Sequence, residues 1–308
     1  MLYCADVAGA FDRVKLERLV AKLEKKGLHP HLARVLKSWL GNRTANVAVG
    51  GALSRDLGLS DMVYQGIVLG PVLWNLFYGD VQEACAAADF LELVYADDLN
   101  AYTTAPASSS NEDLLGKAAV CQREVHRWGV ADGVTFEGTK ESPHVLSPSD
   151  PAGENFKMLG VIVDPGLRMQ DEVSHLVGEC SWKLEALLRT IGFHSPMQLL
   201  NLYKAYILSV AEYRTGALYH ASDTVLEPLD RIQKRFLRAL GWTDLDALVV
   251  GNLAPLGLRR GIAMLGMMHR SVLGKGASHF SSLFCLSGEG GALVKKKCCL
   301  VDVGTACK

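Results

Sequence analysis

The sequence predicts an α+β domain followed by a mostly helical region. Short strand-like runs alternate with helical patterns over about the first half of the chain, whereas the part after Asp164 carries long helical patterns. The chain has 308 residues, of which 49% are hydrophobic, and this suffices for one large domain or two smaller ones. We therefore expect an α+β first half and a helical module in the second half.

Strands are expected where short apolar runs are bounded by turn residues. They cover residues 2–8, 90–104 as strand, turn and strand, 135–142, 144–147 and 156–163. Residues 44–59 are expected to form a hairpin around the pair Gly50 and Gly51, because glycine adopts the backbone angles that tight turns need.

Helices are expected where apolar residues recur every three or four positions and a glycine, proline or capping residue marks an end. In the first half these are residues 13–27, 29–41, 70–88 and 111–128. In the second half they are residues 171–191, 195–213, 224–241 and 258–274. Pro71 and Pro196 suit the first helical turn, and Asn111 and Ser195 are the expected caps.

The net charge and the distribution of charged residues bear on whether the protein binds nucleic acid. The net charge is −1 and the isoelectric point is near neutral, whereas a protein that wraps nucleic acid is usually basic. Residues 13–37 nevertheless carry eight lysines and arginines against Glu17 and Glu24, and residues 80–98 carry acids without any lysine or arginine. This distribution suits an enzyme that holds a polyanion and does metal chemistry on it. A solvated helix face beside a chance acidic run is the simpler alternative.

Membrane and secretory signals are not found in the sequence. No uncharged apolar run is long enough to span a bilayer, so no membrane span is expected. The first residues include Asp6 and no basic segment, so we expect no signal peptide and an intracellular protein. The eight cysteines contain no CxxC pair and are expected to be reduced thiols. Four of them follow His279, where a zinc site would fit no common spacing.

Two segments could bring acidic side chains together. Asp6 ends the first expected strand, and Asp97 and Asp98 lie at the tip of the hairpin at residues 90–104. If these elements are neighbours in one sheet, three carboxylates meet at its edge and require cations or a raised pKa. Mg²⁺ is the common cation beside phosphates, and two such ions about 3.5–4 Å apart serve in-line phosphoryl transfer. The alternative is a capping acid at Asp6 and a polar turn at Asp97 and Asp98.

Five blocks of sequence follow one another in a distinctive order. They are ADVAGAFDRV, QGIVLGPVLWNLFYGD, YADDL, FEGTK and FKMLGVIVD, and they cover most of residues 1–165. In order and approximate spacing these blocks resemble the reverse transcriptase family. The second block and the helical region after the last one look most like the non-LTR (LINE-type) retrotransposon branch. Five ordered blocks are far more specific than the YADD box alone.

The resemblance implies an RNA-directed DNA polymerase. Its α+β palm would be an antiparallel sheet with helices on one face, followed by an all-helical thumb and C-terminal region. The implied divisions are a palm at residues 1–164, a thumb at 165–222, a helical module at 223–275, and a tail at 276–308 that we expect to be poorly ordered. The implied partners are an RNA template, a DNA primer and deoxynucleoside triphosphates, in a nuclear or cytoplasmic ribonucleoprotein.

The resemblance also implies metal ligands and a proton donor. Asp6 matches the first metal-binding aspartate, and the backbone carbonyl of Val7 would be an extra ligand. Asp97 matches the second metal-binding aspartate, with Asp98 as its partner at the same site. Two Mg²⁺ ions are the implied cofactor, with Mn²⁺ as a substitute. Lys140 matches a lysine that protonates or neutralises the leaving pyrophosphate, although a solvent-exposed lysine is a comparable interpretation of the local sequence.

Further positions match contacts to nucleotide and primer. Phe11 matches an aromatic steric gate under the sugar, which leaves no room for a 2′-hydroxyl; a core phenylalanine is the alternative. Gln65 and Gly66 match the block that lines the nucleotide and template pocket, where glycine allows close backbone approach. The primer grip between palm and thumb would be Met158, Leu159, Gly160 and Val161, which by themselves are only an apolar strand.

The sequence departs from the family pattern at its start. Only five residues precede Asp6, so we expect a truncated copy that lacks the fingers and the endonuclease domain and has weak or no polymerase activity by itself. One alternative is a catalytically inactive remnant that keeps the fold and at most binds nucleic acid or a protein partner. Another is a group II intron-type enzyme, which shares the YADD box but for which the helical region looks wrong.

Overall fold

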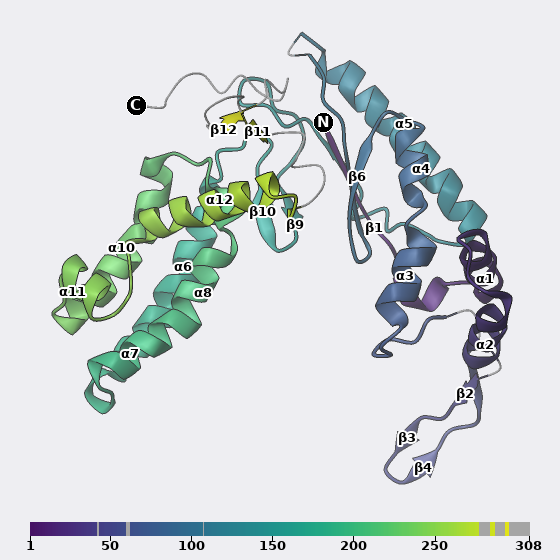
Figure 1. Ribbon diagram of the computed structural model, residues 1–308, viewed down its shortest axis with the longest axis horizontal. Helices are drawn as coiled ribbons and strands as arrows, with labels where there is room; N and C mark the ends of the chain where they lie inside the picture. Colours follow the sequence, from purple (N-terminus) through teal and green to yellow (C-terminus); the bar gives the residue numbers. More distant parts are fainter. Residues whose placement is uncertain (42, 60–61, 107, 277–283, 287–292, 296–308) are drawn as a thin grey trace. The chain divides into compact units, whose positions relative to one another are not determined.

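The computed structural model describes residues 1–41, 43–59, 62–106, 108–276, 284–286 and 293–295 (Figure 1). The chain divides into two compact units, Met1–Leu146 and Ser147–Lys308. The boundary therefore lies before residue 164, where we expected the first domain to end, and the apolar segment at residues 156–163 belongs to the second unit. The four-part division of the chain stays a prediction.

A four-stranded sheet forms the centre of the first unit. Its strands are β1 (Leu2–Asp6), β6 (Leu91–Tyr95), β7 (Asp98–Tyr102) and β8 (Ser142–His144), in the order β6-β7-β1-β8. Every neighbouring pair is antiparallel, as the sequence predicted. The first strand of the chain is thus an inner strand, flanked by strands that come much later.

Helices cover one face of this sheet. They are η1 (Ala10–Arg13), α1 (Leu16–Lys25), α2 (Pro30–Leu40), α3 (Gly70–Tyr78), α4 (Val81–Ala86) and α5 (Asn111–Asp132). Alternate residues of β1 and β7, Tyr3, Ala5, Leu99 and Ala101, are buried in a core shared with these helices. Since side chains alternate between the two faces of a strand, the residues between them face the other way. Figure 1 shows α3, α4 and α5 along the same side of β1 and β6.

The N-cap residue of the long helix α5 lies one position before the residue that we expected. Asn111 was the predicted cap, but Ser110 takes this place, and its Oγ accepts a hydrogen bond of 3.1 Å from the backbone N–H of Asp113. Serine and asparagine are comparable caps, so the local sequence did not distinguish the two. Gly133, with φ of 79°, ends the helix in the left-handed conformation.

The predicted hairpin at residues 44–59 is confirmed as two nested strand pairs. β2 (Arg43–Ala45) pairs with β5 (Leu57–Leu59), and β3 (Ala48–Val49) pairs with β4 (Ala52–Leu53). Gly50 and Gly51 form the turn with φ of 58° and 84°, which glycine adopts without strain. Figure 1 shows the hairpin extending away from α2.

The second unit is mostly helical, as predicted. Its helices are α6 (Gln170–Leu188), η2 (Ile191–Phe193), α7 (Pro196–Tyr203), the π-helical η3 (Lys204–Leu208), α8 (Ser209–Tyr213), α9 (Thr215–Leu218), α10 (Asp223–Leu240), α11 (Asp244–Val249) and α12 (Leu256–Val272). Their core includes Leu176, Leu184 and the stacked rings of Tyr203 and Phe236. Ser195 caps α7 in a capping box with Pro196 at the first position, which confirms that prediction.

A hairpin replaces the single strand that we expected at residues 156–163. β9 (Phe156–Met158) and β10 (Val161–Val163) pair antiparallel, so the prediction of one continuous strand was wrong. The two residues between them have positive φ, 47° at Leu159 and 83° at Gly160, as a two-residue type I′ turn requires. Glycine favours this turn, but leucine rarely adopts a left-handed conformation, and this concealed the turn in the sequence.

The tail contributes one more strand pair. β11 (Phe284–Leu286) and β12 (Leu293–Lys295) pair antiparallel. The rest of the expected tail after Gly276, including the tail cysteines Cys298, Cys299 and Cys307 of the zinc hypothesis, lies outside the described residues. Within the described ranges no helix combines the length and apolar character needed to cross a bilayer.

Candidate active site

Strand pairing brings the predicted acids to one end of the sheet. In the β1–β7 ladder, Asp6 is the register partner of Asp98, and Ala5 pairs with Leu99. Directly opposed residues of an antiparallel pair project from the same face, so the carboxyl groups of Asp6 and Asp98 share the face opposite the helices. Asp97 lies just before Asp98 in the β6–β7 turn. The first strand and the strand that follows the YADD turn are therefore neighbours in the sheet, as we expected.

The pKa of the Asp98 carboxyl group is raised by its surroundings. Partial burial raises its pKa first, and repulsion by Asp6 and then Asp97 raises the pKa further. Lys140 acts in the opposite direction without cancelling the rise. Three carboxylates, Asp6, Asp97 and Asp98, thus lie at this end of the sheet beside Lys140, and a bound cation would reduce the repulsion among them.

Lys140 lies directly on the first aspartate. Its Nζ is 2.6 Å from Oδ2 of Asp6 and 2.8 Å from Oε2 of Glu137, and hydrogen bonds to these two carboxylates raise the pKa of the ammonium group. A turn brings the lysine there: the N–H of Glu137 donates to the carbonyl of Asp6, and the N–H of Lys140 donates to the carbonyl of Glu137. Glu137 was not among the predicted site residues, and only the spacing of a turn could have indicated it.

Trp74 connects two parts of the predicted site that lie far apart in the sequence. The ring of Phe11, on η1, stacks on Trp74 at 5.7 Å between centroids. The indole Nε1 of Trp74 donates a 2.7 Å hydrogen bond to the carbonyl of Ala96, which has φ of 55° in the turn before Asp97. Trp74 is 1% exposed. Trp74 was not among the predicted site residues, because in the sequence it is one more residue of an apolar helix face and nothing marks it as the support of a turn.

The other predicted site residues of the first unit differ in their exposure to solvent. The side chain of Val7 is buried, and its backbone forms an isolated bridge with Phe136. Gln65 and Gly66 form an exposed turn ahead of α3. Gly66 has φ of 83°, and a Cβ there would meet no atom within 4 Å, so its backbone conformation alone favours glycine.

The four primer-grip residues all belong to the β9–β10 hairpin of the second unit. Met158 and Val161 are register partners, and Leu159 and Gly160 form the turn. Tyr213 on α8 donates a 3.5 Å hydrogen bond to the carbonyl of Leu159.

A buried carboxylate supports the second strand of this hairpin. Oε2 of Glu172, on α6, accepts from the N–H of Ile162 at 2.7 Å. The Glu172 side chain is fully buried and pairs with Arg214 at 3.0 Å.

The donor chemistry of the acids suits hard divalent cations. Carboxylate oxygens are the ligands that Mg²⁺ and similar ions prefer, and Asp6 and Asp98 are register partners on one face of the sheet. Among the described residues, no group of three or more His, Cys, Asp or Glu side chains is gathered as a metal site would gather them. In this structure the ammonium of Lys140 satisfies Asp6 instead.

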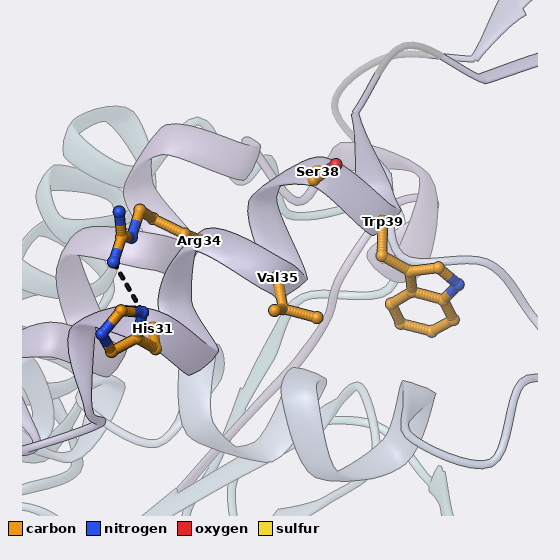
Figure 2. A pocket seen from close by; sticks show the side chains of 5 residues that line it. All are labelled: His31, Arg34, Val35, Ser38 and Trp39. Carbon is orange, nitrogen blue, oxygen red and sulfur yellow. Dashed lines mark hydrogen bonds between the residues drawn. The ribbon is translucent and has the colours of Figure 1, made fainter.

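A shallow hollow lies elsewhere on the first unit, along the outer face of α2 (Figure 2). Arg34 donates a 2.6 Å hydrogen bond to Nδ1 of His31 at its edge. The remaining lining residues are Val35, Ser38 and Trp39. None of these five side chains is acidic, so the hollow offers no carboxylate ligands, and the acidic end of the sheet remains the candidate site.

The fold and the site together define the class of domain. An antiparallel sheet with helices on one face and paired carboxylates on the other, at the end of its inner strands, is the palm of a nucleic-acid polymerase. The family model described as reverse transcriptase (RNA-dependent DNA polymerase) matches residues 1–163. The chain belongs to this family. Its members use divalent metal ions.

Curated relatives refine the comparison. The chain is 26% identical over 253 residues to the RNA-directed DNA polymerase from mobile element jockey of Drosophila funebris, which covers 76% of this chain and 28% of that protein. It is 28% identical over 268 residues to the probable RNA-directed DNA polymerase from transposon BS of Drosophila melanogaster, and this match covers 80% of this chain and 29% of that protein. The expected kinship with non-LTR retrotransposon polymerases is thereby confirmed. The matched part spans less than a third of each relative.

A solved telomerase from Candida albicans shows a weaker likeness. It is 12% identical with a TM-score of 0.41, covering 78% of this chain and 44% of that one.

Proposed function

We propose that this chain carries the palm of an RNA-directed DNA polymerase and transfers nucleotides onto the 3′-hydroxyl of a DNA primer along an RNA template. One observation carries the proposal: the register that sets Asp6 opposite Asp98, with Asp97 in the adjoining turn, in a member of the reverse transcriptase family. Because the chain spans 28% of its jockey relative, the activity, the deoxynucleotide substrates and the nucleic-acid partners are all part of the proposal.

Asp6, Asp97, Asp98 and the carbonyl of Val7 would hold two Mg²⁺ ions, for which Mn²⁺ would substitute. Bound ions of this kind neutralise phosphate charge and lower the pKa of an attacking hydroxyl. The register that sets Asp6 opposite Asp98, and the repulsion that Asp6 and Asp97 exert on the Asp98 carboxylate, support this ligand set. The ammonium of Lys140 lies beside Asp6. During the reaction it would leave that carboxylate and neutralise the negative charge that develops on the leaving pyrophosphate.

Selection and positioning would fall to the surrounding residues. The ring of Phe11, held against Trp74, would exclude a 2′-hydroxyl from the incoming nucleotide. The exposed turn at Gln65 and Gly66 would contact the nucleotide and template, since its backbone is open on one side. The turn of the β9–β10 hairpin, residues 158–161, would grip the primer.

A second candidate function is nucleic-acid binding without catalysis. Two observations favour it: Lys140 neutralises Asp6, and the described residues contain no ready-made cluster of metal ligands. Such a protein would keep the fold while the acids served only as a charged edge. This candidate shares every motif with the first, so only measurement separates them.

Primer extension on the whole chain tests the proposal. We expect slow extension of a labelled DNA primer on an RNA template with deoxynucleotides and Mg²⁺ or Mn²⁺, and a loss of about 100-fold or more in Asp97→Asn. Asp89→Asn is the matched control, because Asp89 is exposed and its φ of 59° suits asparagine. Absence of any extension, together with salt-sensitive RNA binding that Asp97→Asn leaves unchanged, would support the second candidate instead.

A further inference from the structure

The helix α10 presents a row of cations to solvent. Its buried side, which includes Leu229, Phe236 and Leu237, belongs to the core of the second unit. The exposed side carries four basic side chains, which are Arg231, Lys234, Arg235 and Arg238. The last three follow Arg231 by three, four and seven residues, so all four lie on one face of the helix. At a rise of about 1.5 Å per residue, this row is about 10 Å long.

The neighbouring helix α6 extends this surface. The two helices pack against each other, and Arg235 forms an ion pair with Glu185 of α6. Trp182 lies one turn before Glu185 and Arg189 one turn after it, on the same face of α6. Trp182 is 62% exposed. We call this surface the basic face; it consists of Trp182, Arg189, Arg231, Lys234, Arg235 and Arg238.

The positive charge of the basic face is only partly compensated by its own neighbours. Arg231 pairs with Glu227 and Arg235 pairs with Glu185, but the side chains of both pairs are about half exposed or more. Exposed pairs of this kind contribute little and exchange readily for another partner. The five cations of the face and these two acids leave three net positive charges. A polyanion is therefore the partner that the charge of this surface fits.

We infer that the basic face binds single-stranded RNA. One strand of a nucleic acid carries a phosphate about every 3.4 Å, so a row of about 10 Å faces about three phosphates. The exposed ring of Trp182 offers a surface on which an unpaired base stacks. Single-stranded DNA shares this chemistry. We choose RNA because the proposed function requires an RNA template, and to that extent the inference rests on the proposed function.

Two other anionic partners fit the basic face less well. A helix that lies on a membrane buries its apolar side in the bilayer, whereas the apolar side of α10 is already buried in the protein core. An acidic protein segment would satisfy the cations but would give the ring of Trp182 no base on which to stack. The basic face belongs entirely to the second unit, so its RNA binding requires neither the palm acids nor a divalent ion.

Fluorescence anisotropy of a labelled, unstructured RNA of about 12 nucleotides, bound to the whole chain, tests the inference. The solution contains EDTA and neither primer nor deoxynucleotides, so no polymerisation occurs. The variant Lys234→Gln/Arg238→Gln removes two phosphate contacts. Each contact to a single strand contributes about 0.7 to the slope of log K against log salt concentration. We therefore expect the slope to become shallower by about 1.4 and the Kd at about 0.1 M salt to rise about 25-fold.

A second variant separates base stacking from charge. Trp182→Ala removes the ring and no charge, so we expect the Kd to rise at least about fivefold while the salt slope stays that of the wild type. Arg270→Gln/Lys275→Gln is the matched control, because it removes the same charge from exposed positions at and beyond the end of α12 in the same unit. Charges outside the contact are largely screened, so the control should change the Kd by less than about threefold.

The substituted positions are exposed and glutamine is a good helix former, so the variants should fold, which circular dichroism verifies. If Lys234→Gln/Arg238→Gln does not fold, Arg231→Gln/Arg235→Gln tests the same face with the same expectation. Weaker RNA binding than in the control, with the expected salt slopes, supports the inference.

Four results would overturn the inference. They are a double variant that loses no more affinity than the control, a Trp182→Ala variant that binds as the wild type does, a DNA strand of the same sequence that binds about tenfold more tightly than RNA, and displacement of the RNA by phosphatidylserine vesicles or polyglutamate at equal charge concentration. Because the assay contains no primer, a failure of primer extension leaves this result intact. A failure here leaves the proposed function to its own assay.

Discussion

Lys22 joins three helices of the first unit, and replacing it by methionine should weaken that unit strongly. From α1, its Nζ lies 2.7 Å from Oδ1 of Asp80 and 3.0 Å from Oδ2 of Asp132, and it donates to the carbonyl of Phe77 at 2.9 Å. The ammonium also lies 4.9 Å from the centroid of the Trp128 ring. The Lys22→Met variant keeps the length of the side chain and removes the charge.

The expected cost follows from what the substitution leaves behind. Two carboxylates, with side chains 27% and 11% exposed, would face each other without a cation. Removing one partner of a fully buried pair costs about 3–5 kcal/mol, and the residual exposure reduces this, so we expect a loss of about 2–4 kcal/mol. Lys37→Met is the control, because its pair with Glu17 is 51% and 74% exposed and should contribute about 1 kcal/mol or less.

Urea unfolding followed by hydrogen-exchange mass spectrometry of peptides from α1 and α5 would measure the first unit separately from the second. The triple variant Lys22→Met/Asp80→Asn/Asp132→Asn should recover at least half of the loss, since the repelling charges are gone. If Lys22→Met costs no more than Lys37→Met, or if the two asparagines recover nothing, the assignment of a buried three-helix charge network is wrong.

Three further predictions follow from single contacts. Trp74→Phe removes the donor to the Ala96 carbonyl and should cost about 1–2 kcal/mol, with faster hydrogen exchange in the β6–β7 turn; unchanged exchange would contradict this. Leu159→Asn relieves a left-handed leucine and should stabilise the second unit by about 1 kcal/mol in urea unfolding, and a loss of stability would refute the strain. Burial raises the pKa of Glu141, but hydrogen bonds from His126, Gln122 and Tyr3 outweigh it and hold the folded pKa below the ordinary value of 4.5, so the stabilising contribution of Glu141 is present at neutral pH and is lost as the pH falls below 4.5. The unfolding free energy of Glu141→Gln should therefore fall less steeply in that range than that of the wild type, and equal slopes would contradict the lowered pKa.

The sequence predicted the architecture well where local patterns determine it. The β6–β7 hairpin, the Gly50–Gly51 hairpin and the capped helix at Ser195 all depend on residues close together in the chain, and each is present. The acids at Asp6 and Asp98 were found because the pattern of family blocks pointed to them. Their direct opposition in the ladder needed only that the two strands be neighbours.

Long-range contacts could not be predicted in the same way. Trp74, Glu141 and Lys22 each act on residues that are distant in sequence, and nothing in their own neighbourhoods distinguishes them from ordinary core, surface or helix-face residues. The break at Leu159 was missed for a different reason. Leucine opposes the backbone conformation that it adopts there, so the hairpin is determined by Gly160 and by pairing between the two strands.

The position of β1 inside its sheet constrains when this sheet can form during synthesis of the chain. Its two neighbours are residues 98–102 and 142–144, so about 140 further residues must leave the ribosome after β1 before the strand that ends at Asp6 has both partners. Pairings over such sequence separations close slowly. A nascent or prematurely terminated product that stops before residue 142 would present one bare strand edge, and such an edge recruits other strands until it is covered.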